Sequence, residues 1–387
     1  MSMITTDKLR VFEQEMKEIG SDLREVGQLV DEQPERLSLY TSRPSLQLAN
    51  RMMIPPEYGG EPIVTIGSEK YYGLSCIERV TAIEQLAYGD AGTFLGCPGP
   101  SMSGIIINEL ADSQQKERFY SRFLKAPSWT FFALSEPKKG SDATGIQTRV
   151  HRAVDGDMIL NGEKYFIGNG CRADMGLVFA QTSHTPLGIQ VLLIDTSVEG
   201  FSAVPLDTMG VRAVQLSHLT FNGCRIEEEQ VLGRHLSKSR RGFWGALQTF
   251  HQMRPGVAAL GLGVARAAYD YLLAERRQYK EKEQQELEKL CLRLAATRSL
   301  IRYAAMEIDA DGQKGYLASL GKIRATQLAE EATQLAADYL GPGSLYEHPL
   351  LNKWYRDARA FEFMEGTTNI QKVNVFQAYI TGKMSYA

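Results

Sequence analysis

The sequence predicts an α+β protein with a helical N-terminal part, a middle part of antiparallel strands and a helical C-terminal part. Apolar residues recur at three- and four-residue spacing towards both ends of the chain, which is typical of amphipathic helices. Between about residues 128 and 232 the chain instead has short runs of β-branched and aromatic residues. Short strands with frequent turns favour an antiparallel sandwich or barrel over strand–helix–strand units.

The first 125 residues or so have helical patterns throughout. Thr6 is a candidate helix cap, and one apolar stripe follows it as far as Val30. A turn-rich break with two prolines and two glycines occupies residues 50–62. Helical patterns resume after the break, over residues 71–89, 101–110 and 113–124. We therefore expect an N-terminal helical domain over residues 1–127.

The middle part, residues 128–235, contains the apolar runs that predict strands. Turn pairs separate these runs, namely Asp155-Gly156, Asn161-Gly162, Asn169-Gly170, Glu199-Gly200 and Asn222-Gly223. Pairs of this kind are the usual turns of β-hairpins. We therefore expect a β domain in this part of the chain.

Helical patterns return after Gly242 and continue to the end. Three long segments have apolar spacing, and a last helix is expected to begin near Thr368; the segments are residues 243–279, 285–311 and 316–340. The charges of residues 276–289 have mixed signs, which indicates a solvated turn and helix start and not a nucleic-acid patch. We expect a C-terminal helical bundle over residues 236–387.

Composition excludes several classes of function. The formal net charge is −3, which provides no general attraction to nucleic acid or acidic membranes. The five cysteines are widely spaced without a CxxC or CxxH pair, so we expect neither disulfides nor a metal site, and instead buried reduced thiols in a cytoplasmic protein. We expect no signal peptide and no apolar run long enough to span a bilayer.

Residues 363–371 contain the candidate catalytic residue. Glu365 stands in an apolar setting, followed by Gly366, two threonines and an asparagine. Burial raises the pKa of a carboxyl group, which makes it useful as a general base near neutral pH. From this stretch alone, helix capping by Glu365 and Thr367 is the alternative.

Four motifs in this order resemble those of the acyl-CoA dehydrogenase family. They are residues 132–142, residues 164–170, residues 209–212 followed by 250–254, and residues 354–359 followed by 365–371. The resemblance covers residues 54–383. It implies a helical domain, a β domain and a C-terminal four-helix domain, with FAD between the last two.

The resemblance also implies roles for individual residues. Glu365 would be the base that removes the α-proton of an acyl thioester, whose carbonyl would be polarised by the backbone N–H of Glu365 and by a hydroxyl of FAD. Residues on the substrate side would be Ser101, His251, Arg254 and Gly366. Residues that contact the cofactor would be Phe132, Leu134, Ser135, Ser141, Phe166, Gly168, Arg276, Tyr279, Asp338, Gly341, Thr367 and Asn369.

Several positions depart from the family's pattern or have a second interpretation. Gly168 stands where many members have a hydroxyl residue, and Asp338 would repel a pyrophosphate. The glycine of the family's Arg-x-x-Phe-Gly hairpin is missing after Arg276. His251 could bond a polar acyl group or be satisfied by solvent, and Arg356 and Asp357 are expected to form an internal ion pair.

The expected function is FAD-dependent α,β-dehydrogenation of a short, polar acyl thioester in secondary metabolism. Two prolines and two serines in residues 96–103, with Phe363 and Met364 near the base, favour a short acyl group over a long one. Its carrier is left open between CoA and an acyl or peptidyl carrier protein. Expected partners are an electron-transfer flavoprotein or similar acceptor and further copies in a homodimer or homotetramer. The alternatives are an oxidase or monooxygenase of the same fold, and a nucleic-acid-binding relative without enzyme activity.

Overall fold

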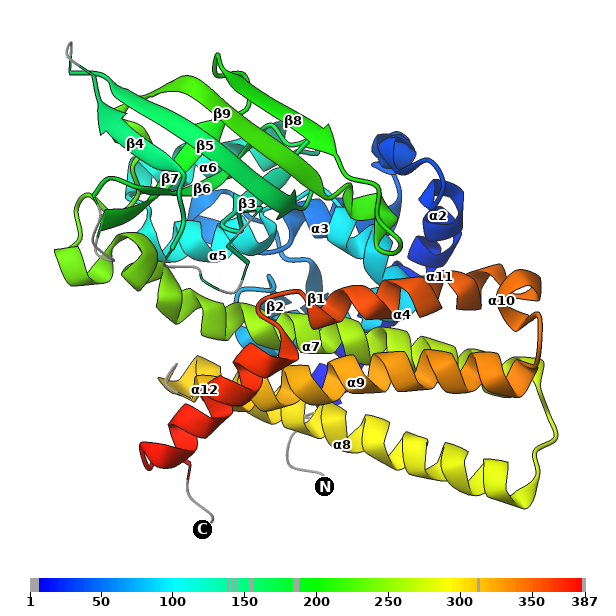
Figure 1. Ribbon diagram of the computed structural model, residues 1–387. Helices are drawn as coiled ribbons and strands as arrows, with labels where there is room; N and C mark the ends of the chain where they lie inside the picture. Colours follow the sequence, from blue (N-terminus) through cyan, green and yellow to red (C-terminus); the bar gives the residue numbers. More distant parts are fainter. Residues whose placement is uncertain are drawn as a thin grey trace.

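The computed structural model describes residues 7–137, 139–140, 142, 145–153, 156–183, 188–311 and 314–384. Figure 1 shows a β-sheet on one side of the molecule and three long helices, α7, α8 and α9, side by side on the other. The helix–sheet–helix order along the chain confirms the α+β class. The three-domain division stays a prediction, and its limits fall in the connections around residues 127 and 235.

The N-terminal part is helical except for one short hairpin. Its elements are α1 (Asp7–Ile19), η1 (Gly20–Asp22), α2 (Leu23–Val30), η2 (Pro34–Tyr40), α3 (Pro44–Arg51), η3 (Pro56–Tyr58), β1 (Val64–Ile66), β2 (Glu69–Tyr71), α4 (Cys76–Gly96), α5 (Ser101–Leu110) and α6 (Ser113–Lys125). The expectation of helices alone was wrong here, because Gly67 adopts φ +61° in the turn that joins β1 to β2. The ring of Tyr71 stacks on Phe12 of α1, with centroids 4.6 Å apart, which holds the hairpin on the helices.

The middle part forms a seven-stranded sheet. Its strands are β3 (Thr130–Ala133), β4 (Arg149–Arg152), β5 (Met158–Ile167), β6 (Met175–Gln181), β7 (Ile189–Asp195), β8 (Phe201–Pro205) and β9 (Ser217–Ile226), in the order β3-β6-β4-β5-β9-β8, with β7 also paired to β6. Most pairs are antiparallel, but β6 runs parallel to β3 and to the end of β4. The prediction of a purely antiparallel sheet was therefore wrong at β6. A hairpin makes the two strands that it joins antiparallel, whereas a long connection allows them to be parallel or antiparallel.

The C-terminal part is the helical bundle that the sequence predicts. It follows the short turns η5 (Arg212–Val214), η6 (Glu228–Gln230) and η7 (Lys238–Arg240), and it contains α7 (Gly242–Glu275), α8 (Glu281–Asp311), α9 (Gly315–Leu340), α10 (Ser344–Glu347), α11 (Pro349–Ala358), η8 (Arg359–Glu362) and α12 (Thr368–Ile380). The start of the last helix at Thr368 confirms the prediction from the sequence.

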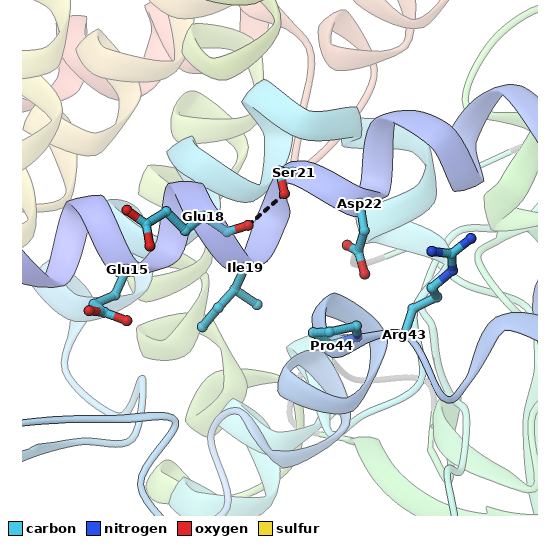
Figure 2. A pocket seen from close by; sticks show the side chains of 7 residues that line it. All are labelled: Glu15, Glu18, Ile19, Ser21, Asp22, Arg43 and Pro44. Atoms are coloured by element: carbon cyan, nitrogen blue, oxygen red, sulfur yellow. Dashed lines mark hydrogen bonds between the residues drawn. The ribbon is translucent and has the colours of Figure 1, made fainter.

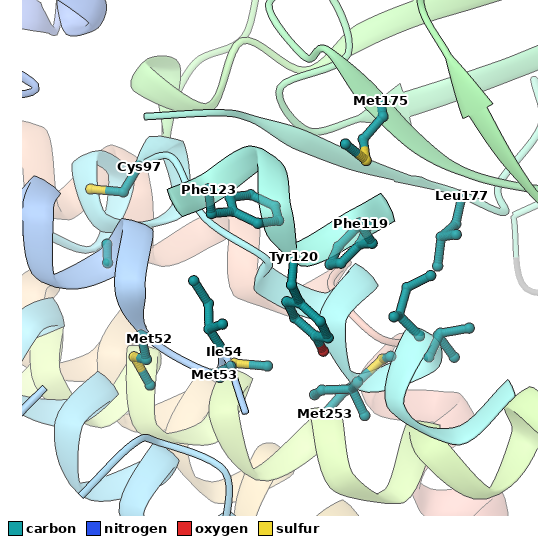
Figure 3. Packing of buried hydrophobic residues seen from close by; sticks show 14 of the residues in the cluster. Met52, Met53, Ile54, Cys97, Phe119, Tyr120, Phe123, Met175, Leu177 and Met253 are labelled. Atoms are coloured by element: carbon teal, nitrogen blue, oxygen red, sulfur yellow. The ribbon is translucent and has the colours of Figure 1, made fainter. Parts of the chain in front are cut away.

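One apolar core crosses all three parts of the chain. Figure 3 shows Ile54 and Tyr120 of the N-terminal part in the same cluster as Leu177 of β6 and Met253 of α7. Because Met253 is buried here, the next residue, Arg254, is held at a fixed place on α7. The core thus positions the helix that carries two of the predicted substrate residues.

Helix α7 corrects one expectation. Among the described residues, Gly245–Glu275 is long and apolar enough to cross a membrane by length and composition, contrary to the prediction that no run is long enough. However, 67% of its most apolar window is buried inside the protein. The helix packs against α4 and α9, so its composition is that of a core helix.

The cysteines are all free. Cys76, Cys97 and Cys224 are buried, whereas Cys171 is half-buried and Cys291 is exposed on α8. The expectation of uniformly buried thiols was therefore wrong for the last two. Position 291 faces outward because the neighbouring Leu290 and Leu294 take the buried side of the helix.

Candidate active site

Glu365 lies in a tight turn between η8 and α12. Its φ is +52°, and that of the following Gly366 is +91°. A left-handed conformation costs a residue with a side chain roughly 1–2 kcal/mol, so the surrounding structure must hold this turn in place. Thr367 caps α12 by accepting from the N–H of Ile370, which makes the capping interpretation right for Thr367.

Side chains from two helices hold the turn. Lys322 of α9 is fully buried, and its Nζ donates to the carbonyl oxygens of Gly366 at 2.8 Å and Glu362 at 2.9 Å. Gln371 of α12 donates from Nε2 to the carbonyl of Glu365 at 2.7 Å, and its Oε1 accepts from Ser319 Oγ at 2.8 Å. These bonds fix both carbonyls of the turn, so the backbone of Glu365 has one defined position.

The surroundings of Glu365 perturb its ionisation. The residue is half-buried, and Arg254 and Lys322 are the positive charges that act on its carboxyl group. Burial raises the pKa of Glu365, while the positive charges of Arg254 and Lys322 limit the rise. A buried carboxyl group beside cations stays available as a base.

Arg254 and His251 form a pair on one face of α7. Arg254 Nη1 lies 3.1 Å from His251 Nδ1. Burial, together with the charge of Arg254, lowers the pKa of His251 to about 4. The ring is therefore neutral at physiological pH and accepts at Nδ1, so Arg254 satisfies this nitrogen of His251. Arg254 Nε is buried and has no hydrogen-bond partner among the described residues.

The first two family-like motifs are joined by a buried ion pair. Lys164 Nζ donates to Glu136 Oε1 and to the carbonyl oxygen of Leu134, both at 3.0 Å. The N–H of Tyr165 donates to the carbonyl of Ser135 at 2.9 Å. Burial lowers the pKa of Lys164 to about 8, although Glu136 acts against this change. The pair therefore holds the loop after β3 against β5.

Two aromatic residues of these motifs have different surroundings. Phe132 is half-buried, with its ring centroid 5.2 Å from that of Phe179 and 6.2 Å from that of Phe250. Phe166 is 62% exposed and has a φ of +59°. An exposed aromatic ring in a strained conformation is an available surface for a planar ligand. The predicted contact Ser141 lies outside the described residues.

The structure also limits what Gly168 can do. A Cβ at this position would lie 2.9 Å from Cγ1 of Val214, which is too close. A hydroxyl side chain would therefore require Val214 to move, and Gly168 can offer only its backbone. Asn369 is exposed in the first turn of α12, close in sequence to Glu365.

Ser101 is placed next to the site by its helix. It is exposed at the start of α5, with a φ of +49°. Helix α5 packs against both β3 and α7, the elements that carry Phe132 and Arg254. The structure thus brings the N-terminal part to the same region, and the role of Ser101 on the substrate side stays a prediction.

The remaining predicted cofactor residues lie at the other end of the bundle. Arg276 donates to the carbonyl of Tyr339 at 2.9 Å and pairs with Glu283 at 2.6 Å, and Tyr279 donates to the carbonyl of Leu272. A cavity of about 590 Å³ lies beside this cluster, lined by residues that include Asp338 and Gly341. Lys322 and Asp338 are separated by about 24 Å along α9 at 1.5 Å per residue. One chain therefore has two separate groups of predicted cofactor residues.

A second cavity, of about 400 Å³, lies among the N-terminal helices (Figure 2). Glu15, Glu18 and Asp22 line it together with Arg43. None of the predicted site residues is part of this cavity. Three of its seven lining residues are acidic, and the cavity does not contribute to the arrangement around Glu365.

Two further expectations near the site were wrong. Arg356 and Asp357 do not pair with each other, because neighbouring residues on a helix point about 100° apart. Arg356 pairs with Asp31, while Asp357 binds Lys353 Nζ at 2.7 Å. Phe363 is 74% exposed and so forms no closed wall beside the base.

Sequence reasoning missed Lys322, Glu362 and Ser319. A signal for Lys322 was present, since it is the only charged residue on a stripe of small apolar residues, Ala318, Ala325 and Ala329. Glu362 was not separable from other surface acids. In the structure its carboxylate accepts from the N–H of Thr368 at 2.8 Å, which caps α12 alongside Thr367.

Comparison with protein families gives two matches in this chain. Residues 131–224 match the acyl-CoA dehydrogenase middle domain, and residues 240–380 match the acyl-CoA dehydrogenase C-terminal domain. The chain is 30% identical to the short-chain specific acyl-CoA dehydrogenase of Megasphaera elsdenii over 78% of its length and 83% of the relative's. It is also 30% identical to a 3-(aryl)acrylate reductase of Clostridium sporogenes, over 83% and 84% of the two chains.

Solved structures resemble the whole chain. Butyryl-CoA dehydrogenase from Megasphaera elsdenii superposes with a TM-score of 0.79 at 26% identity, covering 98% of this chain and all of the other. The prolyl acyl carrier protein oxidase AnaB has a TM-score of 0.81 at 18% identity, covering 97% and 99%. The FAD complex of PigA has a TM-score of 0.84 at 20% identity, covering 99% of both chains. The last two show similarity of fold.

Proposed function

We propose that this chain, which belongs to the acyl-CoA dehydrogenase family, dehydrogenates a short, polar acyl thioester with Glu365 as the base. Members of the family are FAD-containing oxidoreductases that act on the CH–CH bond of acyl thioesters. The observation that carries this proposal is the Glu365 turn. It combines a half-buried glutamate of raised pKa, two neighbouring cations and a backbone fixed by Lys322 and Gln371. A residue that only caps a helix needs neither a raised pKa nor neighbouring cations, so capping alone does not explain the surroundings of Glu365.

Glu365 accepts the α-proton of the acyl group. Its raised pKa makes the carboxylate a stronger base, while Arg254 and Lys322 keep a useful fraction ionised. The backbone N–H of Glu365 donates to the thioester carbonyl, where negative charge develops as the proton leaves. A donor placed in this way contributes roughly 3–4 kcal/mol to lowering the barrier.

The residues around Phe166 fit a flavin ring. Phe166 offers an exposed aromatic face, and the loop at Leu134 and Ser135 is held next to its strand by Lys164 and Glu136. FAD, when bound, supplies the acceptor for the β-hydrogen of the substrate, which leaves as hydride. The distant group around Arg276 fits a diphosphate less well, because Glu283 already neutralises the guanidinium and Asp338 adds a negative charge.

We place the substrate among short acyl groups with a polar function. Arg254 Nε lacks a partner among the described residues, and His251 is a neutral acceptor beside it. A polar group on the substrate would satisfy the buried guanidinium, since unpaired buried donors are costly. The proposed carrier is an acyl or peptidyl carrier protein, with a role in secondary metabolism, and the proposed electron acceptor is an electron-transfer flavoprotein.

We also propose a homo-oligomer, as a dimer or tetramer, in the cytoplasm. The outer face of α12 exposes Val373, Phe376, Tyr379 and Ile380, each between 49% and 61% accessible. Contiguous exposed apolar residues are typical of interfaces. Light scattering tests the oligomeric state and cell fractionation the location.

The experiment is turnover of two short acyl thioesters, the apolar butyryl and the polar 4-hydroxybutyryl, by the wild type and Glu365→Gln. Mass spectrometry follows the loss of two hydrogens from the acyl group. We expect the variant to remain folded and yellow without turnover, whereas Glu281→Gln, at an exposed glutamate of α8, should retain activity. Full activity in Glu365→Gln would refute the assignment. Stoichiometric peroxide from the wild type would favour the oxidase instead.

A further inference from the structure

An exposed basic segment precedes the helix that carries His251 and Arg254. The segment, residues 234–241, contains Arg234, Lys238, Arg240 and Arg241 and no acidic residue, in a chain whose net charge is −3. It connects the sheet to α7, with Leu232 bonded to the carbonyl of Val191 at one end and Gly242 beginning α7 at the other. The concentration of positive charge is therefore local and fixed to the fold.

Part of the charge of this segment is uncompensated. Arg234 lies 3.3 Å from Glu228, which also pairs with Arg152, and 3.9 Å from Glu229. Arg240 is exposed and Arg241 half-buried, and neither has a carboxylate within 4.0 Å among the described residues. Nearby positive charges repel one another, so an anionic partner would relieve the repulsion.

The shape of the segment favours a protein partner over a small anion. Small molecules bind mainly in concave sites with converging polar groups. Neither cavity described above is lined by residues 234–241, and the arginines lie on an exposed stretch of chain. Spread, exposed charges of one sign are typical of the rim of a protein interface, where they steer association.

The distance from this segment to the candidate active site suits a tethered substrate. Helix α7 runs without interruption from Gly242 past Arg254, a distance of about 18 Å at 1.5 Å per residue. An acyl group on a carrier protein is attached through an extended phosphopantetheine arm, whose phosphodiester is itself negative. A carrier docked at the basic segment could therefore place its thioester near Glu365.

We propose that residues 234–241 form the docking surface for the acidic face of an acyl carrier protein. This inference rests on the proposed function and identifies the carrier of the same substrate. The surface contributes to recognition of the carrier protein and not to the chemical step. It therefore affects KM for the carrier-bound substrate and leaves kcat unchanged.

The experiment compares three forms of one substrate: butyryl-loaded acyl carrier protein, butyryl-CoA and butyryl-pantetheine. The variant is Arg240→Glu with Arg241→Glu. The matched control is Lys282→Glu with Lys289→Glu, which makes the same change of charge at exposed positions of α8. We expect the first variant to raise KM for the loaded carrier about tenfold, as the loss of about 1.4 kcal/mol implies, with KM for butyryl-pantetheine unchanged. Added salt should shrink this difference.

Several outcomes would overturn the docking proposal while leaving the dehydrogenase assignment intact. These are an equal rise in KM for butyryl-CoA and the carrier, an equal effect of the control variant, or wild-type turnover of butyryl-CoA without turnover of the loaded carrier. If no thioester is oxidised, the proposed function fails. Fluorescence titration with labelled carrier protein then tests the docking proposal by itself. That proposal is overturned if the variant with both arginines replaced binds the carrier as tightly as the wild type does. Circular dichroism checks folding, and the single change Arg240→Glu at an exposed position replaces the double variant if the latter does not fold.

Discussion

Lys322 Nζ donates a hydrogen bond to the carbonyl oxygen of Gly366 at 2.8 Å, and this contact joins the centre of α9 to the turn that carries Glu365. Lys322 is fully buried, and burial lowers its pKa to about 8, although Glu362 and Glu365 oppose the change. One side chain thus fixes the position of the proposed base and supplies a positive charge beside it.

Replacing Lys322 by Met should lower kcat about 100-fold, because small displacements of catalytic groups have effects of this size. It should also move the acidic limb of the pH–rate profile to higher pH. A cation beside a carboxylate lowers its pKa, so removing the cation lets the pKa of Glu365 rise further. The alkaline loss of activity near pH 8, where Lys322 loses its proton, should disappear.

Lys322→Arg is the matched variant, because it keeps the charge. It should restore the acidic limb at least in part, with Arg254 still contributing its own charge to the site. An unchanged pH profile in Lys322→Met would show that Lys322 does not act on Glu365. Stopped-flow measurement of flavin reduction against pH distinguishes these outcomes.

Glu365→Gly should be more stable than Glu365→Ala by about 1 kcal/mol, because the φ of +52° at this position costs alanine energy that glycine does not lose. Both variants should lack activity. Urea unfolding of the two proteins measures the difference. Equal stability of the two would contradict the strained conformation of the turn.

The pair Lys164–Glu136 should be far more sensitive to a single change than to a double one. Lys164→Met leaves the carboxylate of Glu136 buried without its cation, and we expect a loss of about 3–5 kcal/mol in the free energy of unfolding. Lys164→Met combined with Glu136→Gln should lose less, because no uncompensated charge remains. A double-mutant cycle with no coupling would show that the pair is not linked in this way.

His251 should make the protein less stable in acid. Its pKa is lowered from 6.5 to about 4 in the folded protein, so the unfolded chain binds the proton more tightly between these values. The contribution to stability is therefore present above about pH 6.5 and is lost as the pH falls to 4. It amounts to at most about 3 kcal/mol.

In His251→Gln the free energy of unfolding should depend less on pH between 4 and 6.5. Thermal unfolding at several pH values compares this variant with the wild type. His235→Gln, at an exposed histidine before α7, is the control and should retain the dependence of the wild type. Identical slopes in all three proteins would contradict a depressed pKa at His251.

Much of the fold was predictable because its signals are local. The helical spacing of residues 243–340 and the turn pairs around residues 155–223 depend on residues close together in the chain. The parallel pairing of β3 with β6 was not predictable in this way, since the partners Thr130 and Met175 are 45 positions apart in the sequence. Nor was the pairing of Arg356 with Asp31, which lies more than three hundred residues away in the sequence.

By itself, the sequence determined the α+β class, the order of the three parts and the identity of Glu365 as the candidate base, because apolar spacing and short motifs act over a few residues. The tertiary structure alone decided what surrounds that carboxyl group. It brought Lys322 of α9 and Arg254 of α7 to Glu365 and placed Arg276 and Asp338 far away along the bundle. The physical reason is that a pKa depends on burial and on charges a few ångströms away in space, and these distances are set by how the helices pack.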